Sequence, residues 1–491
     1  MPAATPEETA PNAPLLELAS TRGRLTLATV TVGSGIALLD GTVVNIAIRQ
    51  IGTQLDASLS ELQWVVNGYA LSLAALILVG GALGDRLGRK RLYLAGIAAF
   101  AVGSALCAFA QTPTQLVLFR VLQGIAAAMV APGALAIIQG SFRQEDRAAA
   151  IGTWAGMAGI AGAIGPFLGG FLIEHGGWRW IFAINLPLCV LVLVLGSRMP
   201  ESRDDEAPRH FDWKGALAGI AALGTSTYVL TSWPTLPAYA VWLGAVLAVS
   251  SVVLFVWLED HDQAMVPLDL FRSRVFTAAN VMTLLTYGAL GSVLFFLVLN
   301  LQVTSGYSAI GAGTATLPIT LAMILLSSRF SRLSAVTGPR LPMTVGPLVC
   351  AFGTLLLSGV GAHASYWTDV LPGIAIFALG LSMLVSPLTV AVLAAAPDRH
   401  AGVSSGVNNA VARTGSLLAV AALPAVVGLT GGDYRDPSAL GAGYHRALLI
   451  SAVLLAGGGV VSWFGLHGIG RVGHDDLGTA RPGTTRRKDP A

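Results

Sequence analysis

Fourteen apolar stretches, each long enough to cross a lipid bilayer, follow one another along the 491 residues of this chain. A helix of about 20 mostly apolar residues spans the hydrocarbon core, where the backbone polar groups must be bonded within the segment itself. Only 11% of the residues are charged, against about 25% in soluble domains. The sequence therefore predicts an all-α polytopic membrane protein. The expected spans are 25–48, 62–83, 92–110, 114–138, 148–173, 178–197, 213–232, 238–258, 278–300, 309–328, 341–360, 369–392, 402–428 and 446–468.

The basic residues indicate which side of the membrane each loop faces. With fourteen spans both termini lie on one side, and 23 of the 29 Lys and Arg residues then fall on that side. Four lie on the other side, and the remaining two, Arg120 and Arg413, lie inside spans. Loops rich in Lys and Arg stay in the cytoplasm. We therefore predict cytoplasmic N- and C-termini and a multi-pass protein of the cell (plasma) membrane.

Two pairs of similar loop sequences indicate an internal repeat. The loop 84–91 has a degenerate echo at 329–340, and Asp146-Arg147 has an echo at Asp398-Arg399. The offsets, 249 and 252 residues, fit two parallel six-helix halves with two extra helices between them. Transporters use parallel repeats with the substrate site at the midplane. The expected parts are a tail 1–24, an N-terminal half 25–197, linkers with two extra helices 198–277, a C-terminal half 278–468 and a tail 469–491.

Several other classes of protein leave signatures that this sequence lacks. No Gly-x-x-x-x-Gly-Lys-Ser/Thr loop occurs, so an ATP-driven pump is not expected, and no Ser/His/Asp or Cys/His arrangement predicts an enzyme. All three cysteines fall in apolar stretches, which argues against a disulfide framework or a metal site. We expect no cofactor, no metal and no nucleic-acid partner, and a monomer suffices for the mechanism proposed below.

The loop after the second span carries an ordered run of glycine, acidic and basic residues. An aspartate at the membrane edge can bond a helix N-terminus or pair with arginine. Glycine permits a tight turn and a close approach of two helices. Ordinary cytoplasmic basic charge with a helix cap is the alternative interpretation. The run reads Gly81-x-Leu83-x-Asp85-Arg86-x-Gly88-Arg89-Lys90.

The fourth span contains Arg120, in the run Leu116-x-x-x-Arg120-x-x-Gln123-Gly124. Placing an arginine at the centre of a membrane helix costs about 2.5–3.5 kcal/mol on insertion scales, unless it faces a partner or water. Arg120 is therefore a candidate for proton coupling. Snorkelling of its side chain toward the outer face is the alternative.

The first span contains Asp40, the only acidic residue well inside any span. Apolar surroundings favour the protonated form of a carboxyl group, so such a group can take up and release a proton. Asp40 is our candidate for the main proton carrier. A structural hydrogen bond to a neighbouring helix is the alternative.

The fifth span is rich in glycine and contains one proline. Small residues let membrane helices pack backbone to backbone, and a proline weakens the local hydrogen bonding so that the helix can bend. An ordinary small-residue packing face is the alternative. The candidate residues are Gly152, Gly165, Pro166, Gly169 and Gly170.

In order and position these motifs resemble the signatures of the major facilitator superfamily, and more narrowly those of its 14-span drug:proton antiporter family. The resemblance covers nearly the whole chain. The departures are Ala161, where the pattern has glycine, and Arg49, where it usually has proline. It implies the major facilitator fold and a conformational latch in the 81–90 loop. It also implies an antiporter role for the fifth span, whose motif importers generally lack.

The resemblance and the intramembrane residues together predict a proton-coupled efflux antiporter that works by alternating access. With one carboxylate in the membrane, we expect small lipophilic substrates that are neutral or monocationic. The energy comes from the proton gradient. The candidates for the substrate cavity are polar or aromatic: Asn45, Tyr69, Gln123, Phe295, Phe296, Asn408, Asn409 and Arg413.

Two alternatives stay open at this point. The chain could be a dedicated exporter of one metabolite, such as an antibiotic, a siderophore or an amino-acid derivative. More remotely, it could be a non-transporting membrane receptor or scaffold. That alternative predicts decayed motifs and a sizeable soluble domain, and the sequence has neither.

Overall fold

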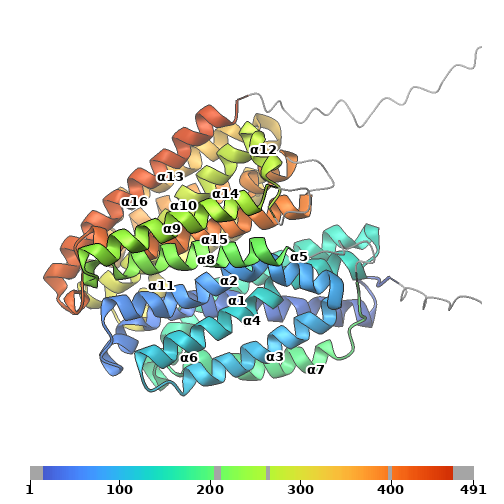
Figure 1. Cartoon of the computed structure of the whole chain (residues 1–491), viewed down its shortest axis with the longest axis horizontal. Coiled ribbons are helices and arrows are strands. Elements are labelled where there is room, and N and C mark those ends of the chain that lie inside the picture. The colour runs from blue at the N-terminus through green and yellow to red at the C-terminus, as the bar shows by residue number, and fades with distance from the viewer. Residues whose placement is uncertain (1–14, 204–211, 261–265, 396–400, 468–491) are drawn as a thin grey trace, which may run out of the picture.

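The computed structural model describes residues 15–203, 212–260, 266–395 and 401–467, which form a bundle of long helices (Figure 1). Twelve helical segments among these residues are long and apolar enough to cross a membrane. The one β-type contact in the described chain is an isolated bridge between Leu16 and Phe142. The predicted all-α class is confirmed.

The first part of the chain forms a group of closely packed helices. A capping box of Ser58 and Glu61 begins the second helix, and Thr112 caps the fourth, which has Pro113 at its first position. These caps bond the free N–H groups of each first turn. The helices are α1 (Thr21–Gln54), α2 (Leu59–Leu87), α3 (Arg89–Ala108), α4 (Pro113–Ser141), α5 (Gln144–Gly176), α6 (Trp180–Ala183) and α7 (Asn185–Gly196).

The expected sixth span, 178–197, is interrupted. The chain leaves regular helix at Ile184, between α6 and α7. Pro187 explains the break, because its ring has no N–H and clashes with the carbonyl of Ala183 four residues earlier. Even with the break included, the apolar segment Trp180–Gly196 is shorter than each of the twelve segments counted above.

The last part of the chain forms a second group of helices. Pro318 lies in the first turn of α12, where the expected span 309–328 is divided at Thr316. A π-turn, Tyr366–Val370, leads into α14, and 3₁₀ turns lie at Leu268–Arg272 and Asp433–Arg435. The helices are α10 (Arg274–Val303), α11 (Ala309–Ala315), α12 (Leu317–Thr337), α13 (Arg340–Leu357), α14 (Leu371–Ala394), α15 (Ala401–Val426) and α16 (Pro437–Gly465).

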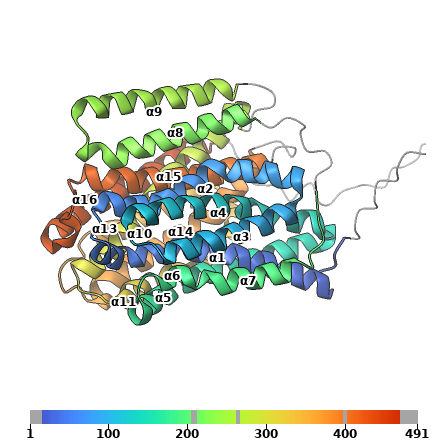
Figure 2. The ribbon, with the colours of Figure 1, turned by 60° about the horizontal axis from the view of Figure 1, so that its bottom comes forward.

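A hairpin of two helices lies outside both groups. α8 (Trp213–Ser232) and α9 (Ala238–Leu258) pack against each other around the 3₁₀ turn Trp233–Thr235, with the bounds expected from the sequence. α8 also contacts α2 and α15, whereas α9 has no buried residue and forms an outer layer (Figure 2). A helix that is apolar all round and unburied by protein is suited to lipid. α8 is rich in Gly, Ser and Thr and is not among the twelve segments that are long and apolar enough to cross a membrane.

The two groups meet along α1 and α10, α5 and α11, and α2 and α15. Within the described residues, the hydrogen bonds that join them gather toward one end of the bundle, where α1 ends and α2 begins. We call this the clamped end. It is defined by these contacts: Arg49 Nη1 to Gln302 O (2.7 Å), Gln302 Nε2 to Ile46 O (2.9 Å), Leu59 N to Gly431 O (2.8 Å), Gln63 Nε2 to Val420 O (2.8 Å), Ile310 N to Glu174 Oε1 (2.8 Å), Tyr434 Oη to Ala57 O (2.7 Å) and Arg435 Nη2 to Asp56 Oδ1 (2.8 Å).

Candidate functional site

Asp40 on α1 and Arg120 on α4 form a buried ion pair. Arg120 Nη1 lies 2.5 Å from Asp40 Oδ2, and each residue is 1% exposed. A charge this far from water is tolerated only when it is paired and its remaining hydrogen-bonding capacity is used. The two intramembrane residues that the sequence singled out separately are thus in direct contact.

Two side-chain amides complete the coordination of the carboxylate. Asp40 Oδ1 accepts hydrogen bonds from Gln123 Nε2 at 3.0 Å and Asn185 Nδ2 at 3.1 Å. The same amide nitrogens lie 2.7 and 3.0 Å from Ser104 Oγ on α3. Arg120 in turn donates from Nη1 to Gln123 Oε1 at 2.7 Å and from Nε to the Val65 carbonyl at 3.1 Å. Polar side chains from α1, α3, α4 and α7 therefore form one connected network.

Aromatic rings cover the guanidinium. Arg120 Cζ lies 4.3 Å from the centre of the Tyr69 ring and 5.8 Å from that of Phe182. A cation over a ring face is stabilised by the ring quadrupole, more strongly where water is excluded. The Tyr69 hydroxyl donates to the Ala37 carbonyl at 3.3 Å. Tyr69, predicted as a cavity residue, thus lies beside the ion pair in this structure.

Close helix packing brings these polar groups together. Gly124 on α4 lies against α2, where a Cβ atom would come within 3.0 Å of Tyr69 Cα. Any larger residue at that position would push α4 and its Arg120 away from α2. The sequence analysis did not assign Ser104 or Asn185 to the site. Asn185 could have been found from the sequence, because it lies two residues before Pro187. The helix break at that proline directs the Asn185 amide into the bundle.

The loop motif forms its own network at the end of the bundle opposite the clamp. Arg89 Nε bonds Asp85 Oδ1 at 2.8 Å, and Arg89 Nη1 reaches the Ala136 carbonyl of α4 at 3.3 Å. Gly88 has a φ of +104° and joins α2 directly to α3. Gly81 faces Pro132 of α4. These contacts tie α2, α3 and α4 together within the first helix group.

The glycines of α5 allow close contacts with α1 and α11. A Cβ at Gly169 would lie 2.6 Å from Val43 Cγ1, and one at Gly170 would lie 2.6 Å from Ile310 Cα. Gly165 faces Thr42, and the Pro166 carbonyl lies against Gly313. Gly152 has no neighbour within 4 Å of such an atom. The later part of the motif therefore lies at the junction of the two groups, and its beginning does not.

The other predicted cavity residues fall in different surroundings. Phe295 and Phe296 are fully buried in the apolar core of α10, packed edge to face with centroids 5.4 Å apart, so they present no open surface here. Asn408 donates to Asn280 Oδ1 at 3.1 Å and to Thr283 Oγ1 at 2.8 Å. The remaining three are partly or fully accessible: Asn45, Asn409 and Arg413.

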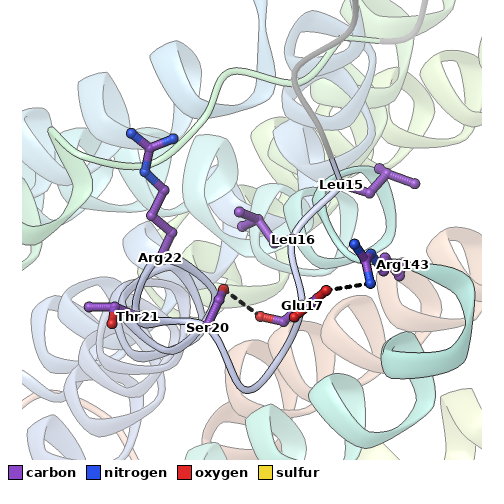
Figure 3. A pocket seen from close by; sticks show the side chains of 7 residues that line it. All are labelled: Leu15, Leu16, Glu17, Ser20, Thr21, Arg22 and Arg143. Atoms are coloured by element: carbon purple, nitrogen blue, oxygen red, sulfur yellow. Dashed lines mark hydrogen bonds and ion pairs between the residues drawn. The ribbon is translucent and has the colours of Figure 1, made fainter.

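A surface hollow beside the first turn of α1 lies apart from the Asp40 network (Figure 3). Glu17 Oε1 pairs there with Arg143 Nη1 at 2.5 Å, and about half of each side chain is exposed. Exposed pairs contribute little stability or selectivity, so we assign no ligand to it. Among the described residues, no cluster of His, Cys, Asp and Glu is suited to hold a metal ion.

Comparison with known proteins identifies the superfamily that the sequence motifs resemble. Residues 30–420 match the family described as Major Facilitator Superfamily. The chain is 33% identical over 454 residues to the methylenomycin A resistance protein of Bacillus subtilis (strain 168), covering 90% of this chain and 96% of that protein. It is 33% identical over 420 residues to the tetracenomycin C resistance and export protein of Streptomyces glaucescens, covering 83% and 76%. A crystal structure of a bacterial homologue of the human lysosomal transporter Spinster, in an inward-facing and unoccupied conformation, has a similar fold. Its TM-score is 0.64 at 17% identity, over 91% of this chain and 97% of that one.

Proposed function

Because this chain belongs to the major facilitator superfamily and is a drug-efflux transporter rather than an enzyme, we propose that it exports small lipophilic compounds in exchange for protons. The ion pair of Asp40 and Arg120 carries the proposal. It is a titratable carboxylate within a transport fold, held by a network that a single proton would disrupt.

The proposed topology has fourteen spans, in which the interrupted segment α6–α7 and the helix α8 add to the twelve segments that are long and apolar enough to cross a membrane. The excess of Lys and Arg in alternate loops supports cytoplasmic termini in the cell membrane. The clamped end is then extracellular. Since the hydrogen bonds joining the two halves gather there, the conformation is inward-facing.

Protonation of Asp40 would couple to movement of α1. A neutral carboxyl group leaves the Arg120 guanidinium buried without its counter-charge, which is strongly unfavourable at such a site. Relief requires α1 and α4 to rearrange. Arg49, part of the clamp, lies nine residues along α1 from Asp40, about 13 Å at 1.5 Å per residue. A shift of α1 as one rigid helix therefore carries the change to the extracellular closure.

The remaining site residues take supporting roles. We propose that the network around Asp85 and Arg89 latches the alternative conformation, and that Gly165, Gly169 and Gly170 provide the sliding contact between α5 and the facing helices. Inward proton flow supplies about 2.3 kcal/mol per charge per 100 mV of membrane potential, to which the pH gradient adds. A monomer is sufficient for this cycle.

A dedicated exporter is the second candidate. Both relatives reported above are named for resistance to a single antibiotic, and this observation is the basis of the second candidate. Expression in a host strain lacking its own major exporters would separate the two candidates. Protection against several chemically unrelated drugs indicates broad specificity, whereas protection against one class indicates a dedicated exporter.

The proposed coupling is tested in liposomes that contain the purified full-length protein, an internal pH dye and an imposed pH gradient. A panel of lipophilic compounds that includes ethidium is added in turn. We expect at least one compound to trigger proton movement in the wild type, and Asp40→Asn to reduce this flux by tenfold or more. The control, Asp269→Asn, alters an exposed carboxylate and keeps the wild-type flux. Full coupling in Asp40→Asn contradicts the proposal.

A further inference from the structure

Arg413 is a membrane-embedded cation without a partner in this structure. It lies at the middle of α15, and its Nε atom is buried with no hydrogen-bond acceptor. Within the described part of the chain, no residue forms an ion pair or a hydrogen bond with its guanidinium. The residue as a whole is half-buried. An arginine at this depth is costly unless something compensates its charge.

Among the described residues, no carboxylate forms an ion pair with Arg413. Asp40 is fully engaged by Arg120, Gln123 and Asn185. Of the charged residues that the sequence places well inside spans, two are arginines, Arg120 and Arg413, and one is a carboxylate, Asp40. Between residues 274 and 465 no acidic residue falls in the middle of a span; those present are Asp369, Asp398, Asp433 and Asp436.

Arg413 faces the junction of the two helix groups. On α15, Gly406 lies against Leu78 of α2, and the Val420 carbonyl accepts a hydrogen bond from Gln63 of α2. Arg413 is midway between these two contacts and seven residues, two helical turns, from each. It therefore projects from the same face toward α2. Asn409, one turn away on that face, is exposed.

Helix packing places Arg413 near the proton-carrying network. Its helix α15 packs against α2, which carries Tyr69, and against α10, which carries Tyr287. Tyr69 also covers Arg120 at 4.3 Å. α2 therefore packs against both α4, which carries Arg120, and α15, which carries Arg413.

We propose that Arg413 binds an acidic group of the transported compound, so that the substrate is a lipophilic monoanion such as an aromatic carboxylate. The guanidinium fork matches a carboxylate in a bidentate geometry. On the adjacent helix α10, Tyr287 is only partly buried. This inference rests on the proposed efflux function, because the site lies in the path that function requires. It differs from the neutral or monocationic substrate expected from the sequence, where only the charge of Asp40 was counted.

The test uses three probes that share one ring and differ in charge: 1-naphthylacetate, 1-naphthylacetamide and 1-naphthylmethylamine. Binding to the purified full-length protein is measured by titration calorimetry. We expect the wild type to bind the acid at least tenfold more tightly than the amide or the amine. Removing the charge in Arg413→Gln should weaken binding of the acid by roughly 10- to 100-fold, as for a charge-assisted hydrogen bond.

Two further variants make the test independent of any folding defect. Arg413→Lys keeps the charge but loses the planar fork, and should bind the acid with intermediate affinity. Arg446→Gln removes an exposed arginine near the start of α16 and should bind all three probes as the wild type does. A wild type that binds none of the probes, or that binds the amide or amine as tightly as the acid, overturns the proposal. So does an unchanged affinity for the acid in folded Arg413→Gln.

Proton flux separates this inference from the proposed function. If the acid binds through Arg413 and neither the acid nor any compound of the panel moves protons, the anion site stands and the antiport proposal fails. If the amide or the amine drives Asp40-dependent proton flux while the acid does not bind, antiport stands and the anion site is wrong. An equal effect of Arg413→Gln on the affinities of all three probes would mean that Arg413 acts structurally or as another partner of Asp40, which also overturns the inference.

Discussion

Arg49 on α1 donates a hydrogen bond to Gln302 on α10 across the junction of the two helix groups, and Gln302 donates one back to α1. Arg49 Nη1 donates to the Gln302 carbonyl at 2.7 Å, and Gln302 Nε2 donates to the Ile46 carbonyl at 2.9 Å. Position 49 is where the drug:proton antiporter pattern usually has proline, whose side chain could not make the first of these contacts. The clamped end of this protein therefore contains a hydrogen bond that the usual proline could not provide.

Arg49→Ala should remove the hydrogen bond to the Gln302 carbonyl and favour the outward-open conformation. A hydrogen bond from a charged donor contributes about 1.5–3 kcal/mol, so the open population should rise by roughly tenfold or more. Spin labels on α1 and α10, measured by double electron–electron resonance, report the separation of the clamped ends. Arg446→Ala changes another arginine at this end, one that is exposed and bonds only its own helix, and should leave the distances unchanged. An unaltered distribution in Arg49→Ala would show that the pair does not hold the closure.

Gly170→Ala should impair the closed contact between α5 and α11. The added Cβ would lie 2.6 Å from Ile310 Cα, a backbone atom that can retreat only if the helices separate. We expect the transport rate to fall several-fold and labels across α5 and α11 to move apart. Gly162→Ala is the matched control, because a Cβ there meets nothing within 4 Å. If the two substitutions have equal effects, the loss of transport results from the change in helix propensity rather than from close packing.

Asn185→Ala should alter proton coupling as well as stability. It removes a donor to Asp40 Oδ1 and to Ser104 Oγ, which costs about 1–3 kcal/mol at a buried site. With one donor fewer, the network that holds the Asp40 side chain is incomplete, so the pH profile of proton-driven transport should differ from that of the wild type. Asn300→Ala removes an equally buried amide that bonds the Val360 carbonyl. That control should lower the melting temperature but keep the wild-type pH profile of transport, and matching profiles for both variants would argue against a role for Asn185.

The charge moved per transport cycle should identify the substrate class. Export of a monoanion in exchange for one proton transfers two charges across the membrane. A neutral substrate transfers one charge, and a monocation none. Currents on a solid-supported membrane, compared with proton flux under the same gradient, give this ratio directly. We expect two charges per proton with 1-naphthylacetate, and a ratio of one or zero for the transported compound would contradict the assignment of Arg413.

The sequence alone determined the all-α class and the positions of most helices, because lipid leaves a backbone no other bonding partner than its own helix. The hairpin α8–α9 has the bounds that its apolar runs predict. The same physical cost marked Asp40, Arg120 and Arg413 as unusual, since ionisable groups are expensive in a membrane wherever they lie.

Only the tertiary structure decided how those charges are distributed. Asp40 and Arg120 are 80 residues apart and meet because α1 packs beside α4, at a spacing that the contact of Gly124 with α2 helps to fix. Ser104 and Asn185 enter the site from two more helices, which no local pattern specifies. The pairing of Asp40 with Arg120 also leaves Arg413 without a counter-ion. A sequence shows how many charges the membrane must hold, but which of them neutralise one another depends on helix packing.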